Sequence, residues 1–180
     1  MTDLTLLTIC GALRAGSTNR LLLAEAARVF GTAKVAEADL RLPLYDNDLE
    51  DAAGIPDEVQ ALADQIRGAD AVVISTPEYN KSLSGVLKNA LDWVSRVPGA
   101  VWRDKPVAIV SAADGRAGGE RAQFALRLCM VAFRPRLLAG PEVMVANCRS
   151  AFDAAGRLVD ARTVKGLTDL MQSLRVEAMR

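Results

Sequence analysis

Short apolar runs alternate with helical patterns along the whole chain. Five runs have the length and composition of buried strands, and between them apolar residues recur at the three- and four-residue spacing of amphipathic helices. The expected strands span 4–10, 33–39, 71–75, 107–112 and 141–146. The expected helices span 19–30, 56–67, 84–94, 119–133 and 163–176.

This alternation predicts an α/β fold. Near-continuous apolar strands, each followed by a helix, are typical of a parallel sheet that is covered on both faces. Five strands joined by right-handed crossovers fit the doubly wound order 2-1-3-4-5, in which a ligand crevice opens at the carboxyl ends of the first and third strands. We expect one domain over residues 1–180, and the polar stretch 41–54 is its longest irregular segment.

The loop after the third expected strand is crowded with polar side chains. Open α/β sheets bind ligands at such strand exits, and functional residues concentrate in loops of this kind. The alternative is a solvated turn that only leads into the next helix. The candidate binding residues here are Pro77, Glu78, Tyr79 and Asn80, followed by Lys81 and Ser82.

The loop after the first expected strand, residues 11–20, has the features of an anion site. A turn with glycines that runs into a helix points backbone N–H groups and the positive end of the helix dipole at one spot. The alternative is that Ser17 or Thr18 only caps the helix. The candidate phosphate ligands are Arg14, Ser17, Asn19 and Arg20.

The spacing of this loop excludes one common nucleotide site. Gly11, Gly16 and Thr18 nearly satisfy the P-loop pattern, but Ser17 stands where the pattern requires lysine. That lysine neutralises the outer phosphates of a nucleoside triphosphate, so a P-loop kinase is disfavoured, and a single phosphate monoester fits better. The loop after the fourth strand, 111–119, is rich in glycine and would let a ligand approach the backbone closely.

Composition narrows the chemistry further. The chain has no histidine, which excludes Ser-His-Asp and Cys-His catalysis and histidine-ligated zinc sites, so a bound cofactor becomes the natural carrier of chemistry and no metal is expected. Basic and acidic residues balance at 22 each, so neither nucleic acid nor an acidic membrane is an indicated partner. Three widely spaced cysteines and the lack of a leader or a long apolar run predict a cytoplasmic protein with reduced thiols.

Four motifs together resemble the NAD(P)H-dependent FMN reductase family, flavodoxin-like proteins that include quinone, chromate and azo-dye reductases. The resemblance covers nearly the whole chain, and the long segment that begins Pro-Glu-Tyr-Asn is its most specific part. The motifs are G-x-L-R-x-x-S-x-N at 11–19, Leu-Pro-Leu-Tyr at 42–45, Pro-Glu-Tyr-Asn at 77–80 with its continuation to Trp93, and Ser111 with Gly115, Gly118 and Gly119.

The resemblance implies a flavodoxin-like sheet that binds FMN. Its first loop would hold the phosphate through Arg14, Ser17, Asn19 and Arg20. The second, at 77–80, would hold the ribityl chain and ring edge, and Ser111 and Gly115 in the third would flank the ring. Two residues depart from the family pattern: Ala12 stands where a serine is common, and Asp114 where a proline is usual.

The implied activity is hydride transfer from NADPH or NADH through FMN to a small acceptor such as a quinone, free flavin, azo compound or metal oxyanion. The flavin carries this chemistry, so no catalytic side chain is expected. One alternative is a flavodoxin-like electron-transfer protein, which the balanced charge disfavours, and another is a domain without flavin.

Such reductases form homodimers or homotetramers. The apolar segment 97–102 suggests a contact near Trp93 or Trp102, unless both tryptophans cover the sheet edge of a monomer.

Overall fold

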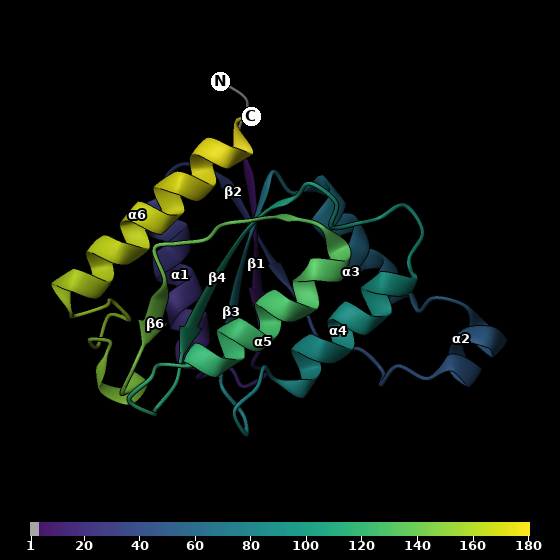
Figure 1. Ribbon diagram of the computed structural model, residues 1–180, viewed down its shortest axis with the longest axis horizontal. Coiled ribbons are helices and arrows are strands. Elements are labelled where there is room, and N and C mark those ends of the chain that lie inside the picture. Colours follow the sequence, from purple (N-terminus) through teal and green to yellow (C-terminus); the bar gives the residue numbers. More distant parts are fainter. Residues whose placement is uncertain (1–3) are drawn as a thin grey trace.

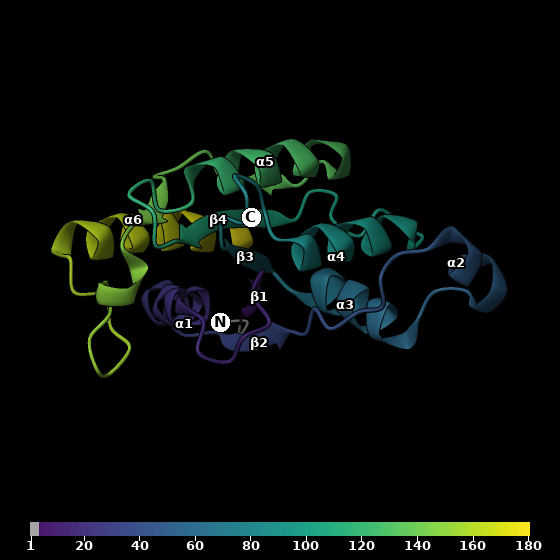
Figure 2. The same cartoon turned by 90° about the horizontal axis from the view of Figure 1, so that it is seen from below.

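The computed structural model describes residues 4–180 and shows a parallel sheet with helices on both faces (Figure 1, Figure 2). The strands follow the order β2-β1-β3-β4-β5, and β6 also pairs with β4, so the predicted order is confirmed. The strands are β1 (Thr5–Cys10), β2 (Lys34–Ala38), β3 (Ala71–Thr76), β4 (Pro106–Ala112), β5 (Arg136–Leu137) and β6 (Val143–Val145).

The helices are α1 (Thr18–Phe30), α2 (Asn47–Ala53), α3 (Asp57–Gly68), α4 (Gly85–Arg96), α5 (Glu120–Met130) and α6 (Ala161–Ala178), with 3-10 turns η1 (Val131–Phe133) and η2 (Cys148–Ser150). Short polar side chains cap the start of α1, α2, α4 and α6, whereas α3 and α5 have no side-chain cap. Ser17, Ser84 and Asp160 each accept a hydrogen bond from a backbone N–H in the first turn of the helix that follows. Within residues 4–180, no helix combines the length and apolar character needed to cross a bilayer.

Two apolar layers cover the sheet, one on each face. Because successive side chains of a strand point to opposite faces, Leu7 and Ile9 of β1 pack with α3, α4 and α5, whereas Leu6 and Cys10 pack with α1 and α6. The strands are thus apolar on both sides, which explains their near-continuous apolar sequences.

The fifth position of the sheet differs from the prediction of one strand at 141–146. β5 pairs with the start of β4 and β6 with its end, so two short strands share one edge of β4. Pro141 lies between them and has no backbone N–H to donate to a ladder. A pairing only two residues long leaves no apolar run in the sequence, which is why β5 was not predicted.

The stretch 41–54 was expected to be irregular, but it contains α2, which stands away from the rest of the molecule in both views (Figure 1, Figure 2). No residue of α2 is buried, so its sequence has no apolar periodicity to reveal it. The segment before α2 is fixed to α4, because the carbonyl oxygen of Pro43 accepts hydrogen bonds from Asn89 Nδ2 at 2.9 Å and Trp93 Nε1 at 2.8 Å.

Both tryptophans are buried within their own chain, so the prediction of an exposed apolar surface around them is wrong. Trp93 is 0% exposed and Trp102 is 3% exposed. Trp93 packs edge-on against Tyr45 at 5.0 Å between ring centroids, and Trp102 packs against Phe133 at 6.4 Å. These contacts remove the reason for placing either residue at a subunit contact, and a homodimer or homotetramer stays a prediction.

A buried carboxylate ties α1 to the segment that precedes α6. Glu25 accepts hydrogen bonds from Arg28 Nε at 2.9 Å and from Arg157 Nη1 at 2.7 Å. The hydrogen bond from Arg28 outweighs the effect of burial and, with Arg157, holds the pKa of Glu25 below its ordinary value. The ionised carboxylate therefore stabilises the fold.

We predict that Glu25→Gln lowers the free energy of unfolding at neutral pH by about 1–3 kcal/mol, the scale of hydrogen bonds to a charged group. A depressed pKa gives a contribution that is present at neutral pH and lost as the pH falls below about 4. Urea unfolding at several pH values should show the wild type and the variant converging in acid. Asp169→Asn, which breaks the exposed pair with Lys165 on α6, is the control and should cost less than about 1 kcal/mol. A gap that is independent of pH would contradict this assignment.

Candidate functional site

Three strand ends meet at one edge of the sheet. The register pairs Cys10 with Ser75 and Thr76 with Ser111, so β1, β3 and β4 end almost level. A cavity of about 270 Å³ lies at this edge. It is lined by Ala12, Arg14, Ser17, Thr18, Asn19, Pro77, Glu78, Tyr79, Ala112, Ala113, Asp114, Cys148 and Arg149.

The first and second loops touch at Gly11. Its N–H donates to Ser75 O at 2.8 Å. A Cβ at this position would lie 3.1 Å from Ser84 Oγ and 3.2 Å from Pro77 Cδ. A side chain at position 11 would therefore require these neighbours to shift by a few tenths of an ångström, so glycine is what permits the contact as it stands.

Asn19 joins three elements through one side chain. Its Oδ1 accepts from Ser75 Oγ at 2.7 Å and from the Ala112 N–H at 3.0 Å, and its Nδ2 donates to Ala112 O at 2.9 Å. The residue is 2% exposed. Asn19 therefore fixes the start of α1 against the ends of β3 and β4, and acts on the cavity mainly by positioning its walls.

The amino end of α1 points into the cavity. Ser17 caps the helix by accepting from the Asn19 N–H at 3.2 Å, and Ser17 and Thr18 both line the cavity. Arg14 lies on the rim and is exposed. Hydroxyl donors, a helix amino terminus and one guanidinium together form a site suited to a phosphate group.

The second loop forms a rigid wall. Tyr79 and Ser82 exchange two backbone hydrogen bonds of 3.1 Å across a tight turn. The two residues between them, Asn80 and Lys81, have positive φ values of 49° and 68°, as in the two-residue turns that join strands. Glu78 accepts from the backbone N–H of Arg121 at 3.1 Å, which ties the wall to α5.

The third loop is held from beneath by Ser111. This residue is fully buried, and its hydroxyl donates to Gly118 O at 2.6 Å and accepts from Gln123 Nε2 at 2.9 Å. Gly118 and Gly119 have positive φ values, and a Cβ on Gly118 would lie 2.6 Å from the carbonyl carbon of Met144. Both glycines are therefore required for this loop to close over Ser111.

The cavity has a fourth wall that the sequence reasoning missed. Cys148 and Arg149 follow β6, and Arg149 Nε lies 3.1 Å from Asp114 Oδ2. The signal was available, because a parallel strand expected at 141–146 also ends at this edge. Asp114, which the sequence marked only as a departure from the family pattern, thus forms an ion pair with Arg149.

Four of the candidate binding residues do not line this cavity. Ser111 is buried, while Asn80 and Gly115 lie elsewhere in their loops. Arg20 pairs with Glu37 of β2 and lines a different hollow beside α1. Close by, burial raises the pKa of the Cys10 thiol, whose S–H points to Ala12 O at 3.4 Å, so this thiol stays protonated at neutral pH.

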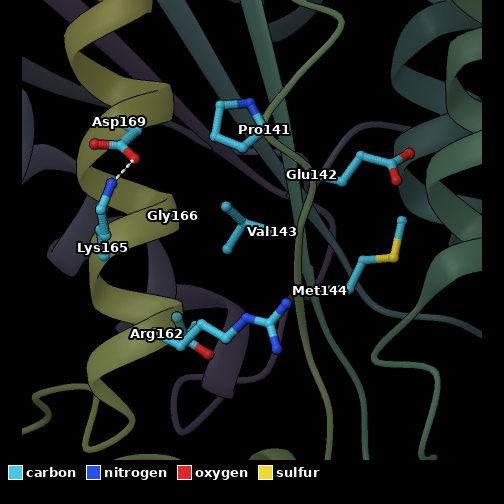
Figure 3. Close-up of a pocket in the computed structure, with 9 residues that line it drawn as sticks. Pro141, Glu142, Val143, Met144, Arg162, Lys165, Gly166 and Asp169 are labelled. Atoms are coloured by element: carbon cyan, nitrogen blue, oxygen red, sulfur yellow. Dashed lines mark hydrogen bonds and ion pairs between the residues drawn. The ribbon is translucent and has the colours of Figure 1, made fainter.

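A larger groove of about 370 Å³ runs between β6 and α6 (Figure 3). Arg162 reaches across it toward β6, and Lys165 pairs with Asp169 along α6 at 2.5 Å. None of the candidate binding residues lies in this groove. The smaller cavity at the strand ends is therefore the site that the sequence and the fold favour together.

Comparisons with known proteins show which family the chain resembles and which solved fold it shares. Residues 4–150 match the family described as NADPH-dependent FMN reductase. An NAD(P)H-dependent FMN reductase of Pseudomonas aeruginosa is 42% identical over 99% of this chain and 97% of its own, and an Escherichia coli quinone reductase is 39% identical over 92% and 90%. A solved flavoenzyme NAD(P)H:(acceptor) oxidoreductase from Paracoccus denitrificans superposes with a TM-score of 0.86 at 30% identity over 97% of both chains.

We predict that Asn19→Ala lowers the free energy of unfolding by about 2–4 kcal/mol, because it leaves buried groups of Ser75 and Ala112 without partners. Ser17→Ala is the matched comparison: it removes only the helix cap and should cost about 1 kcal/mol. Urea unfolding of the protein without added flavin measures both values. If the two variants were equally stable, Asn19 would not be the residue that joins the loops.

Proposed function

The chain belongs to the NADPH-dependent FMN reductase family, and on that premise we propose that it binds FMN at the carboxyl ends of β1, β3 and β4 and uses it to pass hydride from NADH or NADPH to a small acceptor. One observation carries the proposal. The amino terminus of α1, which is suited to bind a phosphate group, lines the same cavity as the loop after β3, and the two loops are in close contact at Gly11. The relatives named above support it, since they are reductases of flavin and quinone.

The donor set fits the phosphate end of FMN. In this proposal Ser17, Thr18 and the amino end of α1 bind the phosphate and Arg14 adds a positive charge, while Asn19 holds the cradle in place. Ala12 removes a hydroxyl from the rim, but the remaining donors are sufficient for a monoester. Arg20 would contribute only if its guanidinium left Glu37.

The remaining walls suit the rest of the cofactor. Pro77, Glu78, Tyr79 and Asn80 would lie along the ribityl chain and the ring edge, and Gly115 would lie in the loop that flanks the ring. Ser111 would act from below, by holding that loop closed through Gly118.

FMN bound at this site would supply the chemistry for moving a hydride between the nicotinamide and the acceptor. The residues of this chain bind and orient it: the phosphate cradle fixes one end, and the rigid turn at Tyr79 fixes the wall near the other. No side chain is required to move a proton, in agreement with the absence of histidine. We propose a quinone, flavin, azo compound or metal oxyanion as the acceptor.

We predict that either NADH or NADPH bleaches the visible absorbance of the FMN-loaded protein without oxygen, and that a quinone then restores it. Hydride transfer within a bound complex requires no partner protein, so the purified chain should suffice. If dithionite reduces the flavin but neither nucleotide does, the electron-transfer alternative is favoured instead.

We predict that FMN binds at least tenfold more tightly than riboflavin, which lacks the phosphate, as measured by calorimetric titration. Arg14→Gln should weaken FMN by about 1–3 kcal/mol, the value of a hydrogen bond to a charged group, and leave riboflavin unchanged. Arg20→Gln is the matched comparison and should have the smaller effect, since that guanidinium is paired with Glu37. Equal affinity for FMN and riboflavin would mean that the phosphate does not bind at α1.

A further inference from the structure

A second hollow lies at the opposite end of β4 from the proposed FMN site. Its volume is about 260 Å³, and it lies between the end of α4, the turn 100–103 and η1. Arg103, on its rim, precedes the first residue of β4, whereas the proposed FMN site lies beyond the last. The two hollows share no lining residue.

The walls of this hollow are aromatic and aliphatic. Trp102 and Phe133 line it with their ring planes inclined at 48°, and Val97 and Val101 add branched side chains. Flat apolar groups bind in such surroundings because they bury surface against rings that are already fixed.

Two arginines give the hollow a positive rim. Arg103 and Arg134 both line it, and neither forms an ion pair or a side-chain hydrogen bond with any residue in the part of the chain that the structure describes. Most arginines of this chain have an acidic or carbonyl partner, as Arg96 does with Glu50. A guanidinium has five N–H donors in a planar fork that matches a carboxylate.

The indole N–H of Trp102 differs from that of Trp93 in having no partner among the described residues. Its Nε1 is buried and has no acceptor among residues 4–180. Trp93 has the usual arrangement, since its indole donates to Pro43 O. A buried donor that lacks an acceptor is uncommon in a folded protein.

The backbone around the hollow is held in uncommon conformations. Ala100, Asp104 and Arg134 all have positive φ, at 49°, 58° and 54°. The Asp104 N–H donates to Arg134 O at 3.1 Å, which joins the two sides of the rim. Residues without glycine's freedom keep such conformations only where the surroundings enforce them, so the backbone of the rim is held in place, and the side chains of Arg103 and Arg134 on it are exposed.

We propose that this hollow is a second ligand site, which binds a small planar aromatic carboxylate. The ring would pack on the side of the hollow formed by Phe133 and the edge of Trp102, and the carboxylate would accept hydrogen bonds from Arg103 and Arg134. An inorganic anion would leave the apolar walls uncovered, and a neutral aromatic would leave the arginines unpaired.

The test is a titration of the FMN-loaded protein, followed through its two indole N–H signals by proton–nitrogen NMR. Trp102→Phe identifies the Trp102 signal by removing it, and Trp93 serves as the internal reference. Benzoate should shift the Trp102 signal saturably in the millimolar range or below and leave Trp93 in place. Benzamide, a neutral molecule of the same shape, should bind at least tenfold more weakly, and inorganic phosphate should not shift the signal.

Variants test the role of the arginines. Arg103→Gln with Arg134→Gln should weaken benzoate at least tenfold, whereas Arg162→Gln, in the groove of Figure 3, should leave it unchanged. The proposal is overturned if benzoate does not move the Trp102 signal, if benzamide binds equally well, or if the double variant binds benzoate as the wild type does. Neither the readout nor the variants depend on hydride transfer, so this result is independent of the proposed reductase activity.

Discussion

The site at the strand ends depends on one buried amide. The side chain of Asn19 binds the hydroxyl of Ser75 and both backbone groups of Ala112, so α1 cannot shift without breaking contacts to β3 and β4 at once. The proposed phosphate site is the first turn of that same helix. Its position relative to the second loop is therefore set by internal hydrogen bonds before any ligand arrives, and little ordering remains to oppose binding.

The second constraint on the site is that its loops pack with their backbones close to neighbouring segments. Gly11 lets the first loop rest on Ser84 and Pro77, and Gly118 lets the third loop rest on Met144. Larger residues at these positions would require those neighbours to shift. Charges contribute a further part of the lining, because Asp114 and Arg149 both line the cavity and form an exposed ion pair.

The sheet order and the positions of the three loops could be predicted from the sequence, because buried faces leave a periodic pattern of apolar residues. Strands buried on both faces and helices with one buried face both leave such a pattern. A helix without buried residues, such as α2, and a strand of only two residues, such as β5, leave no apolar periodicity, so neither was predicted. Contacts between distant segments are also absent from local patterns. Trp93 donates to Pro43 and Arg20 pairs with Glu37, so neither the burial of Trp93 against that segment nor the separate position of Arg20 could be inferred from the sequence.

The central claim is that FMN binds with its phosphate at the amino end of α1. A crystal structure of the FMN complex tests it most directly. The account predicts phosphate oxygens within hydrogen-bonding distance of Ser17 and the first N–H groups of α1, with the flavin along Pro77 to Tyr79. A flavin bound in the groove between β6 and α6, or a phosphate far from Ser17, would contradict it.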